Sequence, residues 1–311
     1  MSLLVNFSET VKVVAAVIQR QDNILIALRP DHLHEGGKWE FPGGKQERAE
    51  SAEAALCREL KEELGITPTS YRRLIAVNHQ YPEKHVSLDV WLVTEFLGEP
   101  EGKEGQRVEW VDKAQLSSYT FPAANYPIIK AVHLPACCVI TSPETQVSQI
   151  ADRSFQDEIL IVRFPSLSAA DYSSVASKVV EYRQKGQKVM LTSQMSEVQA
   201  LGADGLHMNS RRLMATDHLE ARGDQWLSAA CHNQEELEKA VALGLDFVLL
   251  SPVRPTTTHP QADPLGWTQF ARLVRGCNLP VFALGGVKPG DLQQAWRSGA
   301  QGVAGIGAFW S

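Results

Sequence analysis

The feature that most constrains the fold is a series of short apolar segments, alternating with helical stretches, that begins after Pro135. Alternating strands and helices predict parallel strands with helices packed on them. Eight such units in about 175 residues indicate a closed (β/α)8 barrel of the TIM type. Because that fold usually takes about 200 to 250 residues, some helices must be short or missing. The predicted strands are 137–140, 159–163, 188–191, 205–207, 226–230, 247–250, 281–284 and 302–305, with helices at 170–184, 195–201, 234–243 and 289–298 among others.

The first 130 residues follow a different pattern. Two apolar segments around a QRQDN turn predict a β-hairpin, and a helix follows with Ser51 as N-cap and Gly65 as C′ residue. The change of pattern predicts two domains, residues 1–133 and 136–311, joined by a short linker. In the first domain, strands are expected at 11–18, 24–28, 72–79, 86–96 and 108–111, and helices at 51–64 and 126–132.

Composition narrows the function classes. The net charge of −6 argues against a protein that holds polymeric nucleic acid, because such proteins need a basic stripe. Five unpatterned cysteines, with no CxxC, suit reduced thiols, so a cytoplasmic location is expected. The N-terminus lacks the features of a signal peptide, and no run approaches 18 apolar residues, so no membrane association is expected.

Three carboxylates on one helix carry the strongest chemical signal. Glu59, Glu62 and Glu63 are spaced i, i+3 and i+4, which places them on one helical face. A hard divalent cation is their natural partner, and Mg²⁺ usually brings substrate phosphates with it. Arg58 and Glu50 are expected to pair and so hold the preceding loop and the helix in register.

The segment from Gly44 to Ile66 matches G-x5-E-x7-R-E-U-x-E-E-x-G-U at each specified position, U being a bulky aliphatic residue. In this it resembles the Nudix family. The resemblance implies an α/β/α sandwich and cleavage of a phosphoanhydride with Mg²⁺, Mn²⁺ being an alternative. It implies Arg58 as a catalytic residue and a metal site formed by Gly43, Gly44, Glu59, Glu62, Glu63 and Glu104.

WEFPGGK, GEPEGKEGQ and FPAANYP extend the resemblance to the MutT-type 8-oxo-dGTP diphosphatases of that family. It implies water attack at the β-phosphorus, giving a nucleoside monophosphate and pyrophosphate. Glu104 would be a metal ligand or base, Asn125 would read the guanine edge, and Phe41 and Arg29 would line the base pocket. The alternatives are a solvated Glu104, a local turn at Asn125, a core Phe41 and a surface Arg29. The remaining candidates for ligands, His32, His34, His79 and His85, lack metal-ligand spacing.

Residues 136–311 resemble the thiamine phosphate synthase and thiazole tautomerase superfamily, through ADGLHM, the 231–260 segment, PVFALGGVKPG and GAQGVAGIGA. The resemblance implies a site for a phosphorylated thiazole or similar small ligand at the C-terminal ends of the strands. Glycines there suit a phosphate cradle, although they also suit turns, and His232 matches a proton-shuttling histidine. The implied site contains Thr256, Thr257, Thr258, Gly285, Gly286, Gly305, Gly307 and His232.

The barrel departs from the synthase pattern where that pattern has carboxylates. Arg163 survives after the second strand, but Thr192 and Ser193 stand where the synthases have an asparagine–aspartate pair. Full synthase activity is therefore not expected. The leading hypothesis is an 8-oxo-dGTP diphosphatase that sanitises the nucleotide pool. The alternatives are a hydrolase of thiamine-related diphosphates with a tautomerase-like or phosphate-ligand-binding regulatory barrel, and a barrel that is only a binding or dimerisation module. Whether the chain forms a homodimer is left open.

Overall fold

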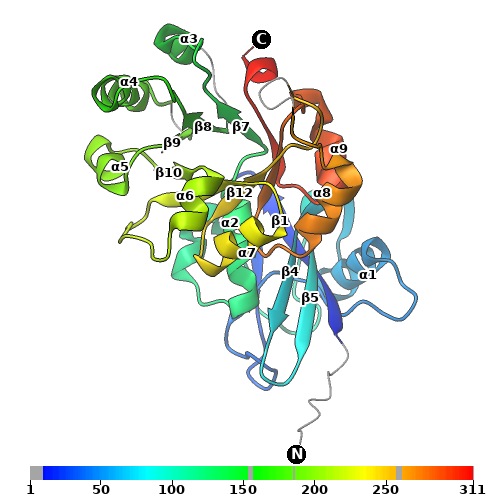
Figure 1. Ribbon diagram of the computed structural model, residues 1–311. Coiled ribbons are helices and arrows are strands. Elements are labelled where there is room, and N and C mark those ends of the chain that lie inside the picture. Colours follow the sequence, from blue (N-terminus) through cyan, green and yellow to red (C-terminus); the bar gives the residue numbers. More distant parts are fainter. Residues whose placement is uncertain (1–9, 153–156, 185, 257–260, 311) are drawn as a thin grey trace, which may run out of the picture. The chain divides into compact units, whose positions relative to one another are not determined.

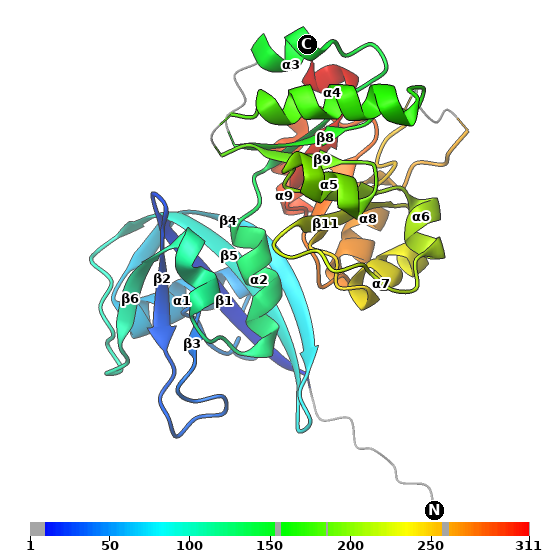
Figure 2. The same cartoon turned by 90° about the vertical axis from the view of Figure 1, so that its left-hand side faces the viewer.

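The computed structural model describes residues 10–152, 157–184, 186–256 and 261–310, and the chain divides into two compact units between His133 and Leu134 (Figures 1 and 2). The first unit is built on a mixed six-stranded sheet in the order β3-β2-β1-β5-β4, with β6 paired to β2. Strand β1 runs parallel to β5 and antiparallel to β2. The strands are β1 (Val11–Arg20), β2 (Asn23–Leu28), β3 (Trp39–Glu40), β4 (Thr67–Gln80), β5 (His85–Leu97) and β6 (Val108–Asp112).

Both faces of this sheet are covered, which makes the unit an α/β/α sandwich. Strand β1 sends Val14, Ala16 and Ile18 to one face, where they pack with helix α1 (Ala52–Leu64). Ala15 and Val17 point to the other face and pack with helix α2 (Tyr126–Val132). Figure 1 shows the two helices on opposite sides of the sheet. Because successive side chains of a strand point to opposite faces of the sheet, β1 contributes residues to two separate cores.

Helix α1 has the ends that its sequence predicts. The Ser51 hydroxyl accepts a hydrogen bond from the Ala54 N–H at 3.1 Å, and Gly65 ends the helix in the left-handed region at φ 73°. Its buried residues are Ala55, Leu56, Leu60 and Leu64, as expected, so the glutamates lie on a different side of the helix from this apolar stripe.

The second unit is a closed barrel of eight parallel strands, in which β14 pairs with β7 to complete the ring. Its strands match the predicted ones to within a residue or two, and Figure 2 shows α4 lying outside β8 and β9. The strands are β7 (Cys137–Ile140), β8 (Glu158–Val162), β9 (Lys188–Leu191), β10 (Gly205–Met208), β11 (Trp226–Cys231), β12 (Phe247–Leu250), β13 (Val281–Leu284) and β14 (Gly302–Gly305).

Short helices explain how the barrel fits its length. Helices α3, α6 and α9 have six residues each, and α5 has seven. Within the described residues, the last strand is succeeded by a 3₁₀ turn, η4 (Gly307–Phe309). The helices are α3 (Val147–Asp152), α4 (Ala169–Glu181), α5 (Met195–Leu201), α6 (Ser210–Ala215), α7 (Gln234–Ala242), α8 (Gly266–Arg275) and α9 (Leu292–Arg297).

The barrel interior is filled with side chains. Phe247 and Phe282 meet edge to face with ring centroids 5.5 Å apart, and Leu134 belongs to the same buried cluster. The carbonyl of Leu134 also accepts a hydrogen bond from the Gln301 side chain at 2.9 Å. The predicted barrel domain began at residue 136, but Leu134 is already part of its core.

In the described part of the chain, no helix combines the length and the apolar character needed to cross a membrane.

Two strands of the first unit differ from the prediction. Strand β3 was not expected, and β4 begins five residues before the predicted strand because register shifts let it follow β5 for longer.

Candidate functional site

A glycine pair brings backbone and carboxylates together beside β1. Gly43 adopts φ 146°, and a Cβ there would lie 2.2 Å from the Val14 carbonyl oxygen. A Cβ on Gly44 would lie 2.3 Å from the Glu59 carboxylate. The Gly43 N–H donates to Glu63 Oε2 at 2.9 Å, and the Gly44 carbonyl accepts from the Val14 N–H at 2.9 Å. Gly43 is required because a side chain there would overlap the backbone of β1, whereas a side chain at Gly44 would displace the Glu59 carboxylate.

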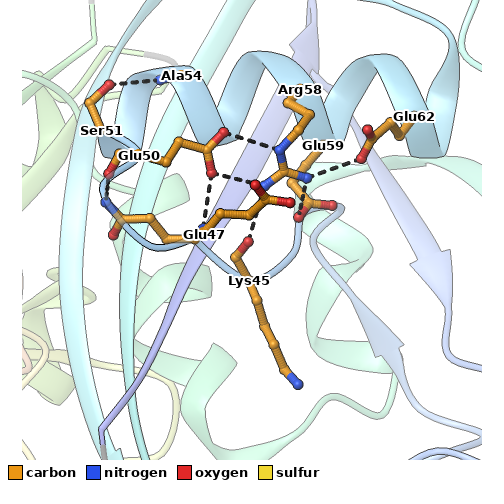
Figure 3. A network of polar contacts seen from close by, with 9 residues as sticks. Lys45, Glu47, Glu50, Ser51, Ala54, Arg58, Glu59 and Glu62 are labelled. Atoms are coloured by element: carbon orange, nitrogen blue, oxygen red, sulfur yellow. Dashed lines mark hydrogen bonds and ion pairs between the residues drawn. The ribbon is translucent and has the colours of Figure 1, made fainter.

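Arg58 organises the acidic face of α1 (Figure 3). Its Nε and Nη2 donate to the two oxygens of Glu50, each at 3.0 Å, which is the expected ion pair. Its Nη1 donates to Glu59 at 2.9 Å and to Glu62 at 3.0 Å, and Nη2 also donates to the Lys45 carbonyl at 3.1 Å. These contacts use all five guanidinium N–H groups. They raise the pKa of Arg58, and the bond from Arg58 lowers the pKa of Glu50.

Glu63 lies in a largely buried part of the site. Burial raises the pKa of Glu63 to about 8, and the charges of Glu40, Glu59 and Glu104 add to the shift against the Gly43 hydrogen bond. Burial also raises the pKa of Glu59, although Arg58 opposes that shift. The negative charges of the site are therefore only partly compensated by the protein's own groups.

Glu40 is a carboxylate of this site that the helix pattern did not reveal. It lies on β3, where burial raises its pKa, and its charge acts on Glu63. Arg29 forms an ion pair with it. The sequence signal for Glu40 is its place in the WEFPGGK segment. Residue spacing alone cannot show that a residue of β3 lies near α1.

The loop that carries Glu104 is held against the C-terminal end of α1. The Glu63 carbonyl accepts from the Lys103 N–H at 2.8 Å and from the Gln106 side chain at 3.2 Å. The Glu104 N–H donates to Gln106 Oε1 at 2.9 Å. Glu104 is exposed, but its charge raises the pKa of both Glu59 and Glu63. The structure thus brings Glu104 to the carboxylates of the helix.

The residues expected to read the base have different environments. Phe41 is 3% exposed and stacks on Phe121 with centroids 5.5 Å apart, so it is a core residue. Arg29 bonds to Glu40 and donates twice to the His34 carbonyl, at 3.1 and 2.9 Å, so its guanidinium is already engaged. Asn125 is half-buried at the start of α2, and its side chain makes no capping hydrogen bond.

The donor set suits a hard divalent cation. Glu59, Glu62 and Glu63 each bond to protein through one oxygen in the hydrogen bonds described above, which leaves the other oxygen of each for a ligand. Arg58 bridges Glu59 and Glu62, so the positive charge between them comes from the protein itself. Among the described residues, no three acidic, histidine or cysteine side chains are yet arranged around one point that could hold a metal.

The barrel places a histidine at the end of β11. His232 Nδ1 lies 2.9 Å from the Ser251 carbonyl, which can only accept, so Nδ1 carries the proton and Nε2 is the basic nitrogen. Gly285 (φ 89°) and Gly286 (φ 67°) follow β13, and Gly305 ends β14. Thr256 is half-buried, whereas Thr257 and Thr258 lie outside the described residues.

Arg212 is bonded to the segment that follows β9. Arg212 donates to the Ser193 carbonyl and to the Gln194 side chain, the latter at 2.9 Å. Within the barrel, His207 bonds to Ser228 at 2.9 Å, and burial, together with the charge of Arg163, lowers the pKa of His207 to about 3. Burial and the charge of Arg163 therefore favour a neutral His207.

Comparison with known proteins agrees with the division of the chain. The family described as NUDIX domain matches residues 13–131, and the family described as thiamine monophosphate synthase matches residues 137–309, more than half of the chain. An 8-oxo-dGTP diphosphatase of Escherichia coli is 41% identical over 119 residues, which cover 38% of this chain and 92% of that protein.

Two further relatives are named for other activities. A CTP pyrophosphohydrolase of Escherichia coli is 36% identical over 121 residues, covering 39% of this chain and 90% of that protein. A putative thiamine-phosphate synthase of Geobacter sulfurreducens is 34% identical over 126 residues, which cover 40% of this chain and 59% of that protein. The relatives of the first unit are named for different nucleotides, 8-oxo-dGTP and CTP. Their similarity to this chain therefore does not decide which base it prefers.

The raised pKa of Glu63 predicts a pH dependence of stability. In the unfolded chain this carboxyl loses its proton near pH 4.5, but in the folded protein only near pH 8. Between these values the folded state holds a proton that the unfolded chain has released, so the free energy of unfolding falls as pH rises. Glu63→Gln cannot ionise. Denaturant unfolding with a metal chelator should show the variant more stable than wild type at pH 8 and equal to it near pH 4.5. Exposed Glu95→Gln is the control, and identical pH profiles for wild type and Glu63→Gln would contradict the assignment.

Proposed function

Because the chain belongs to the Nudix family through residues 13–131 and to the thiamine monophosphate synthase family through residues 137–309, we propose that its first unit is a Mg²⁺-dependent nucleoside triphosphate pyrophosphohydrolase acting on 8-oxo-dGTP. The observation that carries the proposal is the carboxylate cluster of α1 beside Gly43 and Gly44. The 41% identical 8-oxo-dGTP diphosphatase supports the choice of substrate.

The proposed reaction is hydrolysis between the α- and β-phosphates. The water oxygen bonds to the β-phosphorus as the bond to the bridging oxygen breaks, giving 8-oxo-dGMP and pyrophosphate. Nudix hydrolases generally need divalent metal ions, and such an ion polarises phosphoryl oxygens and acidifies water. Glu59, Glu62 and Glu63 would hold it, with Gly43, Gly44 and Glu104 at the edge of the site.

The protein's own groups would position the reaction. Arg58 holds the loop before α1 through Glu50 and orients the side chains of Glu59 and Glu62. Glu104 approaches from outside the helix and is exposed to solvent, which suits a base that takes a proton from water. Gly43, through its N–H, holds one oxygen of Glu63, so the other oxygen is turned to the ligand.

Base recognition is assigned to Asn125. An amide offers one acceptor and two donors, which suits the mixed edge of a guanine. The absence of a capping bond at Asn125 supports this role, because the side chain is not used to start α2. Arg29 and Phe41 are proposed to support the pocket from behind rather than to contact the base, since one is ion-paired and the other buried.

For the barrel we propose a small-ligand site without full synthase activity. His232 follows β11 and is bonded through Nδ1 to the Ser251 carbonyl, and Gly285, Gly286 and Gly305 lie at the C-terminal ends of β13 and β14 in the same parallel barrel. That arrangement favours a phosphorylated thiazole or a similar ligand, with tautomerase-like proton transfer or regulation as the outcome. Arg212 beside Ser193 opposes a Mg²⁺ site there.

Glu59→Gln should abolish most of the hydrolysis without unfolding the protein. The amide keeps the acceptor for Arg58 but removes the charge that would bind the cation. We expect kcat to fall on the order of 100-fold, as for other groups that stabilise charge in the transition state. Removing metal with EDTA should stop the wild type, and Mg²⁺ should restore it. Glu53→Gln, in the first turn of the same helix, is the matched control. A near-normal rate for Glu59→Gln would overturn the metal assignment.

Asn125→Ala should remove base preference. Wild type is expected to prefer 8-oxo-dGTP over dGTP and CTP, and the variant to lose about 10-fold or more of the preference, because a buried hydrogen bond to the base is lost. The measurement is kcat/KM for each nucleotide, with the exposed Asn23→Ala as the control. If wild type turned over 8-oxo-dGTP and dGTP equally, the sanitising role would be wrong.

The barrel should not contribute to nucleotide hydrolysis. Residues 1–133 alone are expected to have the same kcat/KM for 8-oxo-dGTP as the full chain, because the proposed ligands all belong to the first unit. The full chain should form no thiamine phosphate from hydroxymethylpyrimidine diphosphate and thiazole phosphate. Faster hydrolysis of hydroxymethylpyrimidine diphosphate than of any nucleotide would instead favour the thiamine-related alternative.

A further inference from the structure

We propose that Arg254 is a positioning residue for the small-ligand site of the barrel. It holds the β12 loop, residues 251–256, against the β13 glycines, Gly285 and Gly286. The inference deepens the function proposed for the barrel and rests on it. It assigns recognition of the ligand's phosphate in part to a guanidinium group that would not itself contact the ligand.

The backbone of the β12 loop is bonded to the end of β13. The Val253 N–H donates to the Leu284 carbonyl at 2.9 Å, and the Arg254 N–H donates to the Gly285 carbonyl at 3.0 Å. These bonds continue the pairing of β12 with β13 beyond the last residues of both strands. The loop therefore starts in a fixed position beside the first of the β13 glycines.

The β13 glycines allow the loop to come close. A Cβ on Gly285 would lie 2.8 Å from the Cα of Pro252, and a Cβ on Gly286 would lie 2.5 Å from the Pro255 carbonyl oxygen. Among the described residues, no backbone carbonyl accepts a hydrogen bond from the N–H of either glycine. Backbone N–H groups in such a turn suit an anion, so the contact with the loop places two donors for a phosphate.

The side chain of Arg254 bonds to the segment beyond the glycines. Its Nη1 donates to Asp291 Oδ2 at 3.0 Å, and the same oxygen accepts from the Lys288 N–H at 2.9 Å. Asp291 is the last residue of η3 (Pro289–Asp291). Arg254 thus bonds through its backbone before the glycines and through its guanidinium after them. One residue of the β12 loop therefore holds both sides of the β13 turn.

The guanidinium of Arg254 is also held by α8. Its central carbon lies 5.8 Å from the ring centroid of Trp267, within the range of a cation–π contact. Trp267 in turn meets the fully buried Phe270 edge to face, with centroids 5.7 Å apart. These contacts engage the guanidinium with α8 and η3, so its role is positioning and not ligand binding.

The consequence concerns affinity more than stability. The Arg254 and Asp291 side chains are 42% and 18% exposed, and an ion pair so accessible to water contributes little to folding. Without it, however, the Thr256 end of the β12 loop could move relative to the glycine N–H groups. Binding a phosphate would then cost more ordering of the loop. The phosphate of a ligand should be affected and the rest of the ligand should not.

Arg254→Ala in the full chain tests this by calorimetric titration with thiazole phosphate and with the thiazole alcohol that lacks the phosphate. We expect Kd for thiazole phosphate to rise about tenfold, the effect of about one hydrogen bond to a charged group. Kd for the alcohol should change less than about twofold, and Tm should stay close to that of wild type. Arg183→Ala is the matched control, because it breaks an ion pair with Asp204 (2.9 Å) at the opposite end of the barrel. It should bind as wild type does.

A double-mutant cycle tests whether Arg254 acts through Asp291. Asp291→Asn keeps an oxygen that can accept from the Lys288 N–H but removes the charge that pairs with Arg254. Adding Asp291→Asn to Arg254→Ala should raise Kd no further. An unchanged Kd in Arg254→Ala, an equal loss for both thiazoles, or fully additive effects would overturn the inference while the barrel site stands. A wild type that bound no thiazole phosphate would overturn both.

Discussion

The guanidinium of Arg58 is the group on which the first unit's site depends. A planar fork with five donors ties the Lys45 carbonyl, Glu50, Glu59 and Glu62 into one arrangement. A lysine ammonium carries its three N–H donors on one nitrogen, so it cannot bond to several acceptors along the edges of a plane as the guanidinium does. The loop that brings the glycine pair to the helix and the helix that carries the carboxylates are therefore joined by one side chain. The same group offsets part of the repulsion among the glutamates.

Much of this unit can be predicted from local sequence patterns. The rest depends on contacts between residues that are distant in the sequence. Ser51, Gly65 and the apolar stripe of α1 define that helix, and the spacing of Glu59, Glu62 and Glu63 defines its acidic face. The partner of Arg29 is eleven residues away on β3, so its ion pair with Glu40 depends on strand pairing that no spacing rule states. Phe41 is buried for the same reason: residue type alone leaves core and pocket open, and only the packing on Phe121 decides.

The barrel was predictable at its strands and less so at its helices. Strands buried on both faces are continuous apolar runs, which is why the eight segments stand out. Helices of six residues, such as α3 and α6, are too short to show a period of 3.6. At the mouth, the position of His232 followed from the end of its strand, but its tautomer depends on the Ser251 carbonyl, 19 residues further along the chain.

The place of Leu134 in the barrel core has a consequence for how such a chain can be divided or extended. Helix α2 of the first unit ends at Val132, with Ala131 buried, and Leu134 already fills the interior of the second. His133 is thus the one residue between two cores. A spacer inserted after Leu134 would displace the residue that Gln301 and the barrel interior hold in place. Here the junction belongs to both modules, with Ala131 buried in one and Leu134 in the other, so a cut that keeps both cores intact falls at His133.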